Sequence, residues 1–295
     1  MKLVSHAISV VIPCFNEHES LEPLLRKIRE RVPGAEIVVV DDGSLPPVPA
    51  YEAVQVIRHP INMGNGAAIK TGARQVTGDI IVFMDGDGQH DPADIPRLLE
   101  KLGEGFGMAV GARVAISHAS IGRRLANSLF NRLASWMTGH RILDLTSGFR
   151  AVRARPFRNI LYLLPNGFSY PATSTMAFFR SGQPVAYVPI TARTRTGESK
   201  IKPLRDGLRF LVVIIRIGAL FSPMRFFLPI AGVVFVSATL FHGYTYFTTG
   251  RFTNMGAVLY IVSFFTLMFG IISEQISALH YRYSEQCDTQ PGDER

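Results

Sequence analysis

This sequence of 295 residues has only two cysteines, Cys14 and Cys287, and one tryptophan, Trp136. So few cysteines exclude a disulfide-stapled fold, and we expect both to be free thiols in a reducing compartment. The sequence also lacks internal repeats, low-complexity tracts and nucleic-acid-binding motifs, so its net charge of +8 does not indicate a nucleic-acid partner. It has no predicted signal peptide, because the apolar residues 7–12 are too few and run into Pro13.

Two segments near the C-terminus lack formal charge altogether, residues 226–247 and 255–273. Each has about the length of a bilayer-spanning helix. We therefore predict two transmembrane helices, at about 226–247 and 255–275, that form an antiparallel hairpin. The alternative is a pair of buried core helices, which is hard to reconcile with so small a protein.

Positive charge is concentrated just before the first of these segments. Residues 193–225 contain eight basic and only two acidic side chains. The positive-inside rule then places this end of the hairpin in the cytoplasm. We expect an integral membrane protein with both termini and the catalytic domain cytoplasmic, in the cell membrane of a bacterium or the endoplasmic reticulum of a eukaryote.

A further helix is predicted between the N-terminal region and the hairpin. On a helix, Arg205, Arg209 and Arg216 fall within about 40° of one another, and most of the remaining circumference is apolar. This narrow basic stripe is typical of a helix in the lipid headgroup layer. The alternative is an ordinary helix packed on the catalytic domain.

Strands and helices alternate through the N-terminal region. Predicted strands lie at residues 8–12, 36–40, 54–57, 80–84, 108–110 and 185–189, and predicted helices at 19–31, 66–76, 92–102 and 121–138. Residues 143–152 are predicted to be irregular. This alternation indicates the α/β class with a mostly parallel, doubly wound sheet. The predicted domains are 1–202 for catalysis, 203–224 for the interfacial helix, 225–280 for the transmembrane pair and 281–295 for a cytoplasmic polar tail.

Asp85 and Asp87 follow the apolar strand 80–84 directly. Carboxylates at the carboxyl end of such a strand face the crevice in which open α/β sheets bind ligands. Carboxylate oxygens suit Mg²⁺ or Mn²⁺, which usually accompany a substrate phosphate. A plain Asp-Gly turn is the alternative. A calcium-binding EF-hand loop is excluded, because it would need Gly at 90 and Glu at 96, where His90 and Pro96 stand.

Four motifs in order resemble glycosyltransferase family 2, which has the GT-A (Rossmann-like) fold: Val10–Glu17 (VVIPCFNE), Val38–Ser44 (VVVDDGS), Asn62-Met63-Gly64 and Asp85-Gly86-Asp87. Ser147-Gly148-Phe149-Arg150, Gly197–Lys200 (GESK) and the terminal hairpin narrow the resemblance. They are similar to the polyprenyl-phosphate glycosyltransferases, the group that contains dolichol-phosphate mannose synthases and undecaprenyl-phosphate sugar transferases. The resemblance covers nearly the whole chain.

Residue chemistry and the resemblance together predict three groups of site residues. The nucleotide sugar is expected to contact Pro13, Asn16, Glu17, Asp42, Asn62, Gly64, Lys70, Asp85 and Gly86. The metal is expected to bind Asp85, Asp87 and Gln89. The lipid phosphate is expected to contact Arg113, Arg124, Ser147, Arg195, Ser199 and Lys200. The resemblance supports Ser147, Ser199 and Lys200 most directly, and the arginines are candidates because arginine forks match phosphate oxygens in pairs.

The predicted diphosphate site also has a physical basis in the residues. The Gly-rich bend at Asn62–Gly66 runs into a predicted helix N-terminus, a favourable site for diphosphate. Many family members carry a basic residue at the position of Asn65, and here Lys70 or an arginine elsewhere is expected to substitute.

Asp87, Asp144 and Arg150 are the predicted catalytic residues, and Asp144 could either orient an arginine or act as a base. His90, His118 and His140 lack metal-ligand spacing and are expected at the surface or in loops.

The predicted function is inverting transfer of one sugar from a UDP or GDP sugar to dolichyl or undecaprenyl phosphate, with Mg²⁺ or Mn²⁺ as cofactor. The hairpin also offers a surface for a homo-oligomer. A processive polysaccharide synthase is a weaker alternative, because its Gln-x-x-Arg-Trp motif is absent and Trp136 follows Ser135. A catalytically inactive membrane scaffold is the other alternative, although it predicts the loss of carboxylates that this chain retains.

Overall fold

The computed structural model describes residues 7–113, 121–167, 169–191, 222–251 and 253–289, with the backbone alone for 121–127 and 280–289. The chain divides into two compact units, Met1–Ile201 and Lys202–Arg295. The sequence predictions for Arg124, Arg195, Ser199, Lys200 and the helix at 203–221 lie outside the described side chains.

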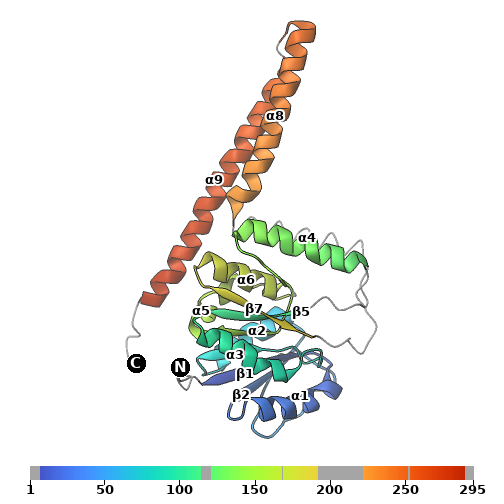
Figure 1. Cartoon of the computed structure of the whole chain (residues 1–295), viewed down its shortest axis with the longest axis vertical. Coiled ribbons are helices and arrows are strands. Elements are labelled where there is room, and N and C mark those ends of the chain that lie inside the picture. The colour runs from blue at the N-terminus through green and yellow to red at the C-terminus, as the bar shows by residue number, and fades with distance from the viewer. Residues whose placement is uncertain (1–6, 114–120, 168, 192–221, 252, 290–295) are drawn as a thin grey trace. The chain divides into compact units, whose positions relative to one another are not determined.

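The first unit is an α/β domain around a seven-stranded sheet of order β3-β2-β1-β4-β6-β5-β7 (Figure 1). The strands are β1 (Ile8–Cys14), β2 (Glu36–Asp41), β3 (Gln55–Arg58), β4 (Ile80–Phe83), β5 (Met108–Arg113), β6 (Arg150–Arg153) and β7 (Val185–Ile190). Strand β6 runs antiparallel to both of its neighbours, and the other pairs are parallel. The predicted mostly parallel sheet is therefore confirmed, but the prediction of an irregular segment at 143–152 missed β6.

Helices cover both faces of this sheet. They are α1 (His18–Arg31), α2 (Asn65–Gln75), α3 (Ile95–Gly103), α4 (Ile121–Thr138), α5 (Ala154–Asn159) and α6 (Tyr170–Arg180), with 3-10 turns at Pro92–Asp94 and Leu161–Leu163. Asp91 caps the turn that follows it, since its side chain accepts a hydrogen bond from Ala93 N at 3.0 Å. It caps the 3-10 turn that precedes α3, so the single helix expected from residue 92 is divided in two.

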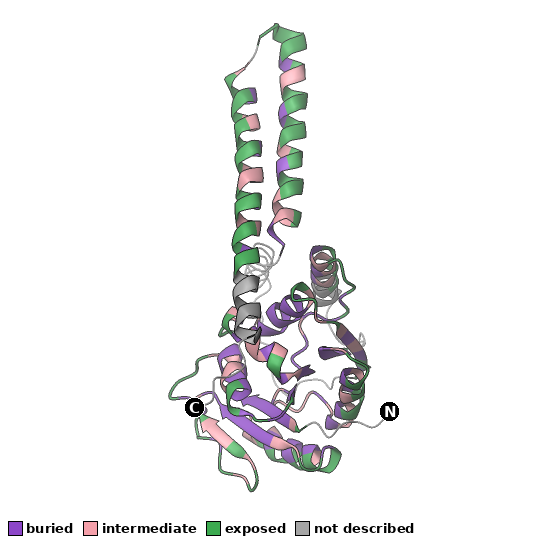
Figure 2. Cartoon of the chain, turned by 90° about the vertical axis from the view of Figure 1, so that its left-hand side faces the viewer, coloured by how far each residue is buried: buried purple, intermediate pink, exposed green. Residues whose placement is uncertain are grey.

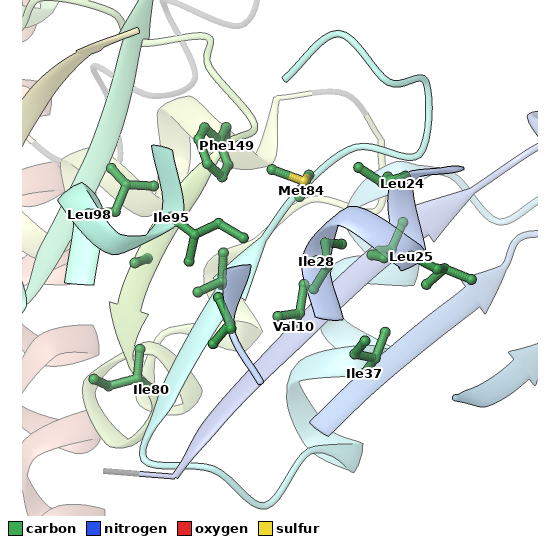
Figure 3. Close-up of a cluster of buried hydrophobic side chains, with 14 of the residues drawn as sticks. Val10, Leu24, Leu25, Ile28, Ile37, Ile80, Met84, Ile95, Leu98 and Phe149 are labelled. Atoms are coloured by element: carbon green, nitrogen blue, oxygen red, sulfur yellow. The ribbon is translucent and has the colours of Figure 1, made fainter. Parts of the chain in front are cut away.

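The central strand β1 is buried on both faces. Val10 and Ile12 of β1 belong to the cluster that packs under α1 and α3, together with Ile28, Leu98 and others (Figure 3). Val11 points the other way, where a β-carbon at Gly72 of α2 would stand 2.3 Å from its Cγ1. Because successive side chains of a strand alternate between faces, a strand buried on both sides reads as a continuous apolar run.

The second unit contains α8 (Pro223–Thr249) and α9 (Asn254–Thr289), which form an antiparallel hairpin (Figure 1). Helix α8 ends at Gly250, whose φ of +64° is the left-handed conformation favoured by glycine at this position. Ser263 Oγ of α9 donates to the Ala231 carbonyl of α8 at 2.8 Å. Glu274 Oε2 accepts from Met224 N at 3.3 Å, so this acid is paired at the positive end of a helix.

Both hairpin helices are long and apolar enough to cross a bilayer, over Pro223–Thr249 and Asn254–Leu279. Only 11 % and 17 % of their apolar windows are buried, which argues against the alternative of two core helices. Figure 2 shows the contrast: exposed residues dominate the hairpin, whereas the strands of the first unit are largely buried. The apolar exterior of the hairpin indicates a membrane protein.

Candidate active site

Asp85 and Asp87 lie just beyond the carboxyl end of β4, where the antiparallel strand β6 brings a second motif to meet them. Ile80 pairs with Arg153, and Phe83 pairs with Arg150. The same register, continued, sets Gly148 opposite Asp85, and a β-carbon at Gly148 would stand only 2.5 Å from Asp85 Oδ2. The strand missing from the sequence prediction is therefore what joins the two motifs.

The carboxylates of this edge suit a divalent cation. Asn65 Nδ2 lies 3.5 Å from Asp85 Oδ1, and Asp87 Oδ1 accepts from Gln89 N at 3.1 Å. The described residues contain no group of three His, Cys, Asp or Glu that could hold a metal. Mg²⁺ takes one or two carboxylates and fills its shell with substrate phosphate and water, so Asp85 and Asp87 fit such an ion without a third acidic residue.

The first loop of the domain lies beside these carboxylates. A β-carbon at Gly86 would stand 3.0 Å from Glu17 Oε2 and 3.3 Å from the Pro13 carbonyl. Asn16 adopts a positive φ of 56°, and its Oδ1 accepts from Leu45 N at 2.9 Å. The structure thus brings together the ends of β1, β2 and β4, as parallel strands do at their common carboxyl edge.

Asp144 binds Arg113 through two parallel hydrogen bonds. Arg113 Nε donates to Oδ2 at 2.8 Å, and Nη2 donates to Oδ1 at 3.0 Å and to Thr146 Oγ1 at 2.6 Å. Burial alone would raise the pKa of Asp144, but the hydrogen bonds and charge of Arg113 outweigh it and hold that pKa below its usual range. Of the two roles left open for Asp144, the geometry favours orienting an arginine.

Asp42 is buried, and its carboxylate links the loop after β2 to residues 59–64 through hydrogen bonds. Oδ1 accepts from His59 Nδ1 at 2.7 Å and from Met63 N at 2.9 Å, and Oδ2 accepts from Gly64 N at 2.8 Å. His59 Nε2 lies 2.9 Å from Thr71 Oγ1 of α2. Asp42 therefore fixes the bend that contains Asn62 and Gly64, a role that the sequence prediction of a nucleoside contact did not include.

The N-terminus of α2 is occupied by the protein itself. Gly66 N donates to the Gly167 carbonyl at 3.3 Å, and Ala67 N donates to the Asn166 carbonyl at 3.0 Å. Lys70 Nζ donates to the Leu164 carbonyl at 3.1 Å and to the Asn166 side chain. The N–H groups of Gly66 and Ala67 and the ammonium of Lys70 are thus engaged within the chain, and the predicted diphosphate site at this helix end stays a prediction.

Arg150 is buried completely. Its Nη1 donates to the Pro171 carbonyl at 3.0 Å and to Ser174 Oγ at 2.7 Å, and its Nη2 donates to the Ser147 carbonyl. Its guanidinium therefore contacts α6, and the predicted catalytic role of Arg150 stays a prediction. Ser147 Oγ is also buried and has no hydrogen-bond partner among the described residues.

The sequence prediction missed the contacts of two further residues. His90 lies in a loop, one of the two predicted settings, but it is buried there and its ring stacks on Phe149 at 5.2 Å. Burial lowers the pKa of His90 to about 4, so its ring is neutral at pH 7. Tyr170 OH donates to the Gly148 carbonyl at 3.2 Å. Neither histidine spacing nor strand periodicity predicts these two contacts, because their partners, Phe149 and Gly148, directly precede strand β6, which the sequence prediction missed. His140 is exposed as expected, whereas His118 lies outside the described residues.

Two family models match this chain. The sequence model of a family described as Glycosyl transferase family 2 matches residues 9–161, and one described as GtrB C-terminal hairpin matches residues 222–279.

Curated relatives cover most of the chain. The undecaprenyl-phosphate mannosyltransferase of Micrococcus luteus is 32 % identical over 66 % of this chain and 87 % of its own length. The undecaprenyl-phosphate 4-deoxy-4-formamido-L-arabinose transferase of Pseudomonas fluorescens is 30 % identical over 80 % of this chain and 73 % of its own. The dolichol-phosphate mannosyltransferase of Pyrococcus furiosus is 34 % identical over 66 % and 59 %.

Among solved structures, glucosyl-3-phosphoglycerate synthase of Mycobacterium tuberculosis, in complex with Mn²⁺, UDP and product, shares the fold. The TM-score is 0.55 and the identity 22 %, over 72 % of this chain and 78 % of that one.

Proposed function

This chain belongs to glycosyltransferase family 2, and on that premise we propose that it moves one sugar from a nucleotide diphosphate sugar to a polyprenyl phosphate at the cytoplasmic membrane face. The observation that carries the proposal is the meeting of Asp85, on the metal side, with the segment that contains Asp144 and Gly148. This contact supports a site in which the leaving diphosphate and the acceptor phosphate bind next to each other. The named relatives act on polyprenyl phosphates, which supports this acceptor.

In the proposed reaction a phosphate oxygen of the lipid attacks the anomeric carbon of the sugar. The new carbon–oxygen bond forms as the bond to the nucleoside diphosphate breaks, and the diphosphate leaves with the electron pair. A phosphate monoester has a second pKa near about 6, so it is largely dianionic at pH 7 and needs no strong base. A single displacement inverts the anomeric centre.

Asp85 and Asp87, with Gln89 by resemblance, would hold the divalent cation, which when bound neutralises the charge of the leaving diphosphate. The nucleoside is proposed to lie by Pro13, Asn16 and Glu17.

Arg113 is the proposed contact for the lipid phosphate. Its side chain is 36 % exposed and is oriented by the ion pair with Asp144. Arginine forks match phosphate oxygens in pairs. Burial lowers the pKa of Arg113, but the hydrogen bonds and charge of Asp144, together with the charge of Asp85, outweigh it and raise that pKa above its usual value. Two anionic phosphates can approach each other only if such positive charge separates them. Ser199 and Lys200 are proposed as further contacts by resemblance, and Arg124 and Arg195 because their guanidinium groups suit phosphate.

A screen of labelled UDP and GDP sugars tests this function. Membranes that contain the full chain and a polyprenyl phosphate should give a labelled product that extracts into organic solvent, and chelation should abolish it. The configuration of the product's anomeric centre, read by NMR, tests inversion. A wild type that transfers no sugar under any of these conditions would favour the inactive-scaffold alternative.

The orientation of the hairpin is a separate proposal. We propose that residues 250–253 lie across the membrane from both termini, as the excess of basic residues before α8 predicts. A cysteine introduced at Arg251 in a variant that lacks Cys14 and Cys287 should react with an impermeant maleimide from the non-cytoplasmic side only. Reaction from the cytoplasmic side alone would reverse the topology.

A further inference from the structure

Arg150 is a buried cation without a hydrogen-bonded carboxylate in the described part of the chain. Its guanidinium donates to a carbonyl and two hydroxyls of α6, from Pro171, Ser174 and Thr175. Removing a charge from water is costly, and even a buried ion pair often gives no more stability than apolar side chains of similar volume. A contribution to stability alone therefore does not account for this cation, and the groups to which Arg150 donates hydrogen bonds indicate its role.

Arg150 and Tyr170 hold two consecutive carbonyls. Arg150 Nη2 donates to the Ser147 carbonyl, and Tyr170 OH donates to the Gly148 carbonyl at 3.2 Å. The two side chains also support each other, because the guanidinium lies 5.7 Å from the centre of the Tyr170 ring. Both residues are almost completely buried, so the backbone at 147–148 is fixed from the interior of the domain.

The same backbone touches the metal-side carboxylate. A β-carbon at Gly148 would stand 2.5 Å from Asp85 Oδ2 and 3.2 Å from Asp85 Cγ, so no larger residue fits there without moving that carboxylate. Contacts of this kind orient a metal ligand although they do not touch the metal.

We propose that Arg150 and Tyr170 are positioning residues, which fix the Gly148 backbone against Asp85 and so hold the Asp85 carboxylate in the orientation that a bound divalent cation requires. This inference rests on the proposed function. It also gives the antiparallel strand β6 a role in the chemistry, since its register sets Gly148 across from Asp85.

The test measures coupling between metal and nucleotide, not turnover. The full chain in detergent is titrated with UDP, and separately with GDP, by calorimetry with and without Mn²⁺. The ratio of the two dissociation constants is the metal–nucleotide coupling. Tyr170→Phe deletes one hydroxyl and keeps the ring over Arg150. Tyr187→Phe is the matched control, because the buried Tyr187 OH has no hydrogen-bond partner within the described residues.

We expect Tyr170→Phe to reduce the coupling about 10-fold and Gly148→Ala about 100-fold, the range found when contacts behind a metal ligand are removed. Tyr187→Phe should leave the coupling unchanged, and the metal-free affinities should stay at the wild-type value in all three variants. Thermal unfolding checks that each variant is folded. Wild-type coupling in both Tyr170→Phe and Gly148→Ala would overturn the inference.

Arg150→Lys separates positioning from direct phosphate contact. Positioning predicts reduced coupling with an unchanged KM for polyprenyl phosphate. Direct contact predicts a raised KM for polyprenyl phosphate with unchanged coupling, and that result would overturn the assignment of Arg150. A wild type whose affinity for both nucleotides ignores Mn²⁺ would overturn the proposed metal-dependent function and this inference with it.

Discussion

Arg113 and Asp144 form a two-point ion pair, with Nε 2.8 Å from Oδ2 and Nη2 3.0 Å from Oδ1. The backbone N–H of Arg113 also donates to Asp144 Oδ2 at 3.2 Å. Asp144 therefore fixes the arginine at three points. A carboxylate engaged in this way orients a cation and is a poor proton acceptor.

Replacing Asp144 by Asn should free the Arg113 side chain. Misplacement of a group by about 1 Å can cost on the order of 100-fold in rate, and we expect a loss of that size in kcat/KM, chiefly through the KM for polyprenyl phosphate. Steady-state transfer assays with varied lipid phosphate measure it. An unchanged lipid KM would remove Arg113 from the acceptor site.

The same pair predicts a pH dependence of stability. An unfolded Asp titrates near about pH 3.9, and the pKa of Asp144 is lower than this in the folded chain because, despite burial, Arg113 stabilises its charged form. The stabilisation is thus complete above about pH 4 and is lost as the pH falls through the folded pKa. The difference in unfolding free energy between wild type and Asp144→Asn should be constant from about pH 8 to pH 5 and shrink below about pH 4. A difference that shrinks already near neutral pH would contradict this assignment.

Asp42→Asn should loosen the bend that runs into α2. The amide supplies only one acceptor oxygen in place of two, so an N–H of Met63 or Gly64 loses its partner. Leaving such a buried group unsatisfied costs about 1–3 kcal/mol. Denaturant unfolding should show this loss, together with a raised KM for the nucleotide sugar. A variant that is as stable as wild type would show that Asp42 does not brace the loop.

Gly66→Ala tests the contact between α2 and residues 164–167. Alanine normally favours a helix over glycine by about 1 kcal/mol, but here its β-carbon would stand 2.0 Å from the Pro165 carbonyl. The clash should outweigh this gain in stability, so the substitution should lower the melting temperature. Gly167→Ala is the control, because a β-carbon at that position meets no atom within 4 Å. Equal melting temperatures for both variants would contradict the described packing.

Cys14 should be unreactive in the folded protein. It is 2 % exposed, and burial raises its pKa to about 11, so it is a protonated and inaccessible thiol at neutral pH. In a Cys287→Ser variant, maleimide labelling at pH 7.5 should be negligible until denaturant is added. Rapid labelling of the native chain would place Cys14 at the surface.

The sequence predicted most of the sheet because apolar strands and Gly-rich bends are local signals. The first-loop residues and the pair Asp85 and Asp87 do lie at one edge, as strands ending at a common edge require. Strand β6 could not be predicted this way. Its four residues, Arg-Ala-Val-Arg, show no strand signal, and only pairing with both β4 and β5 makes them a strand.

The roles of Asp42, Lys70 and Arg150 could not be read from motifs for a related reason. A motif indicates that a polar residue is needed at a position, but not whether that residue faces a ligand or another loop. Asp42 and Arg150 bind carbonyl or N–H groups of distant segments, and those partners become neighbours only when the chain is folded.

The most direct test of the central claim is metal-dependent sugar transfer by Asp87→Ala. Wild type should convert labelled nucleotide sugar into lipid product, lose this activity with EDTA and regain it with Mn²⁺. Asp87→Ala should be slower by about 10³-fold at any Mn²⁺ concentration, whereas Glu104→Gln, which alters an exposed acid paired with Lys101, should match wild type. Transfer by Asp87→Ala at the wild-type rate, or by wild type in EDTA, would contradict the account.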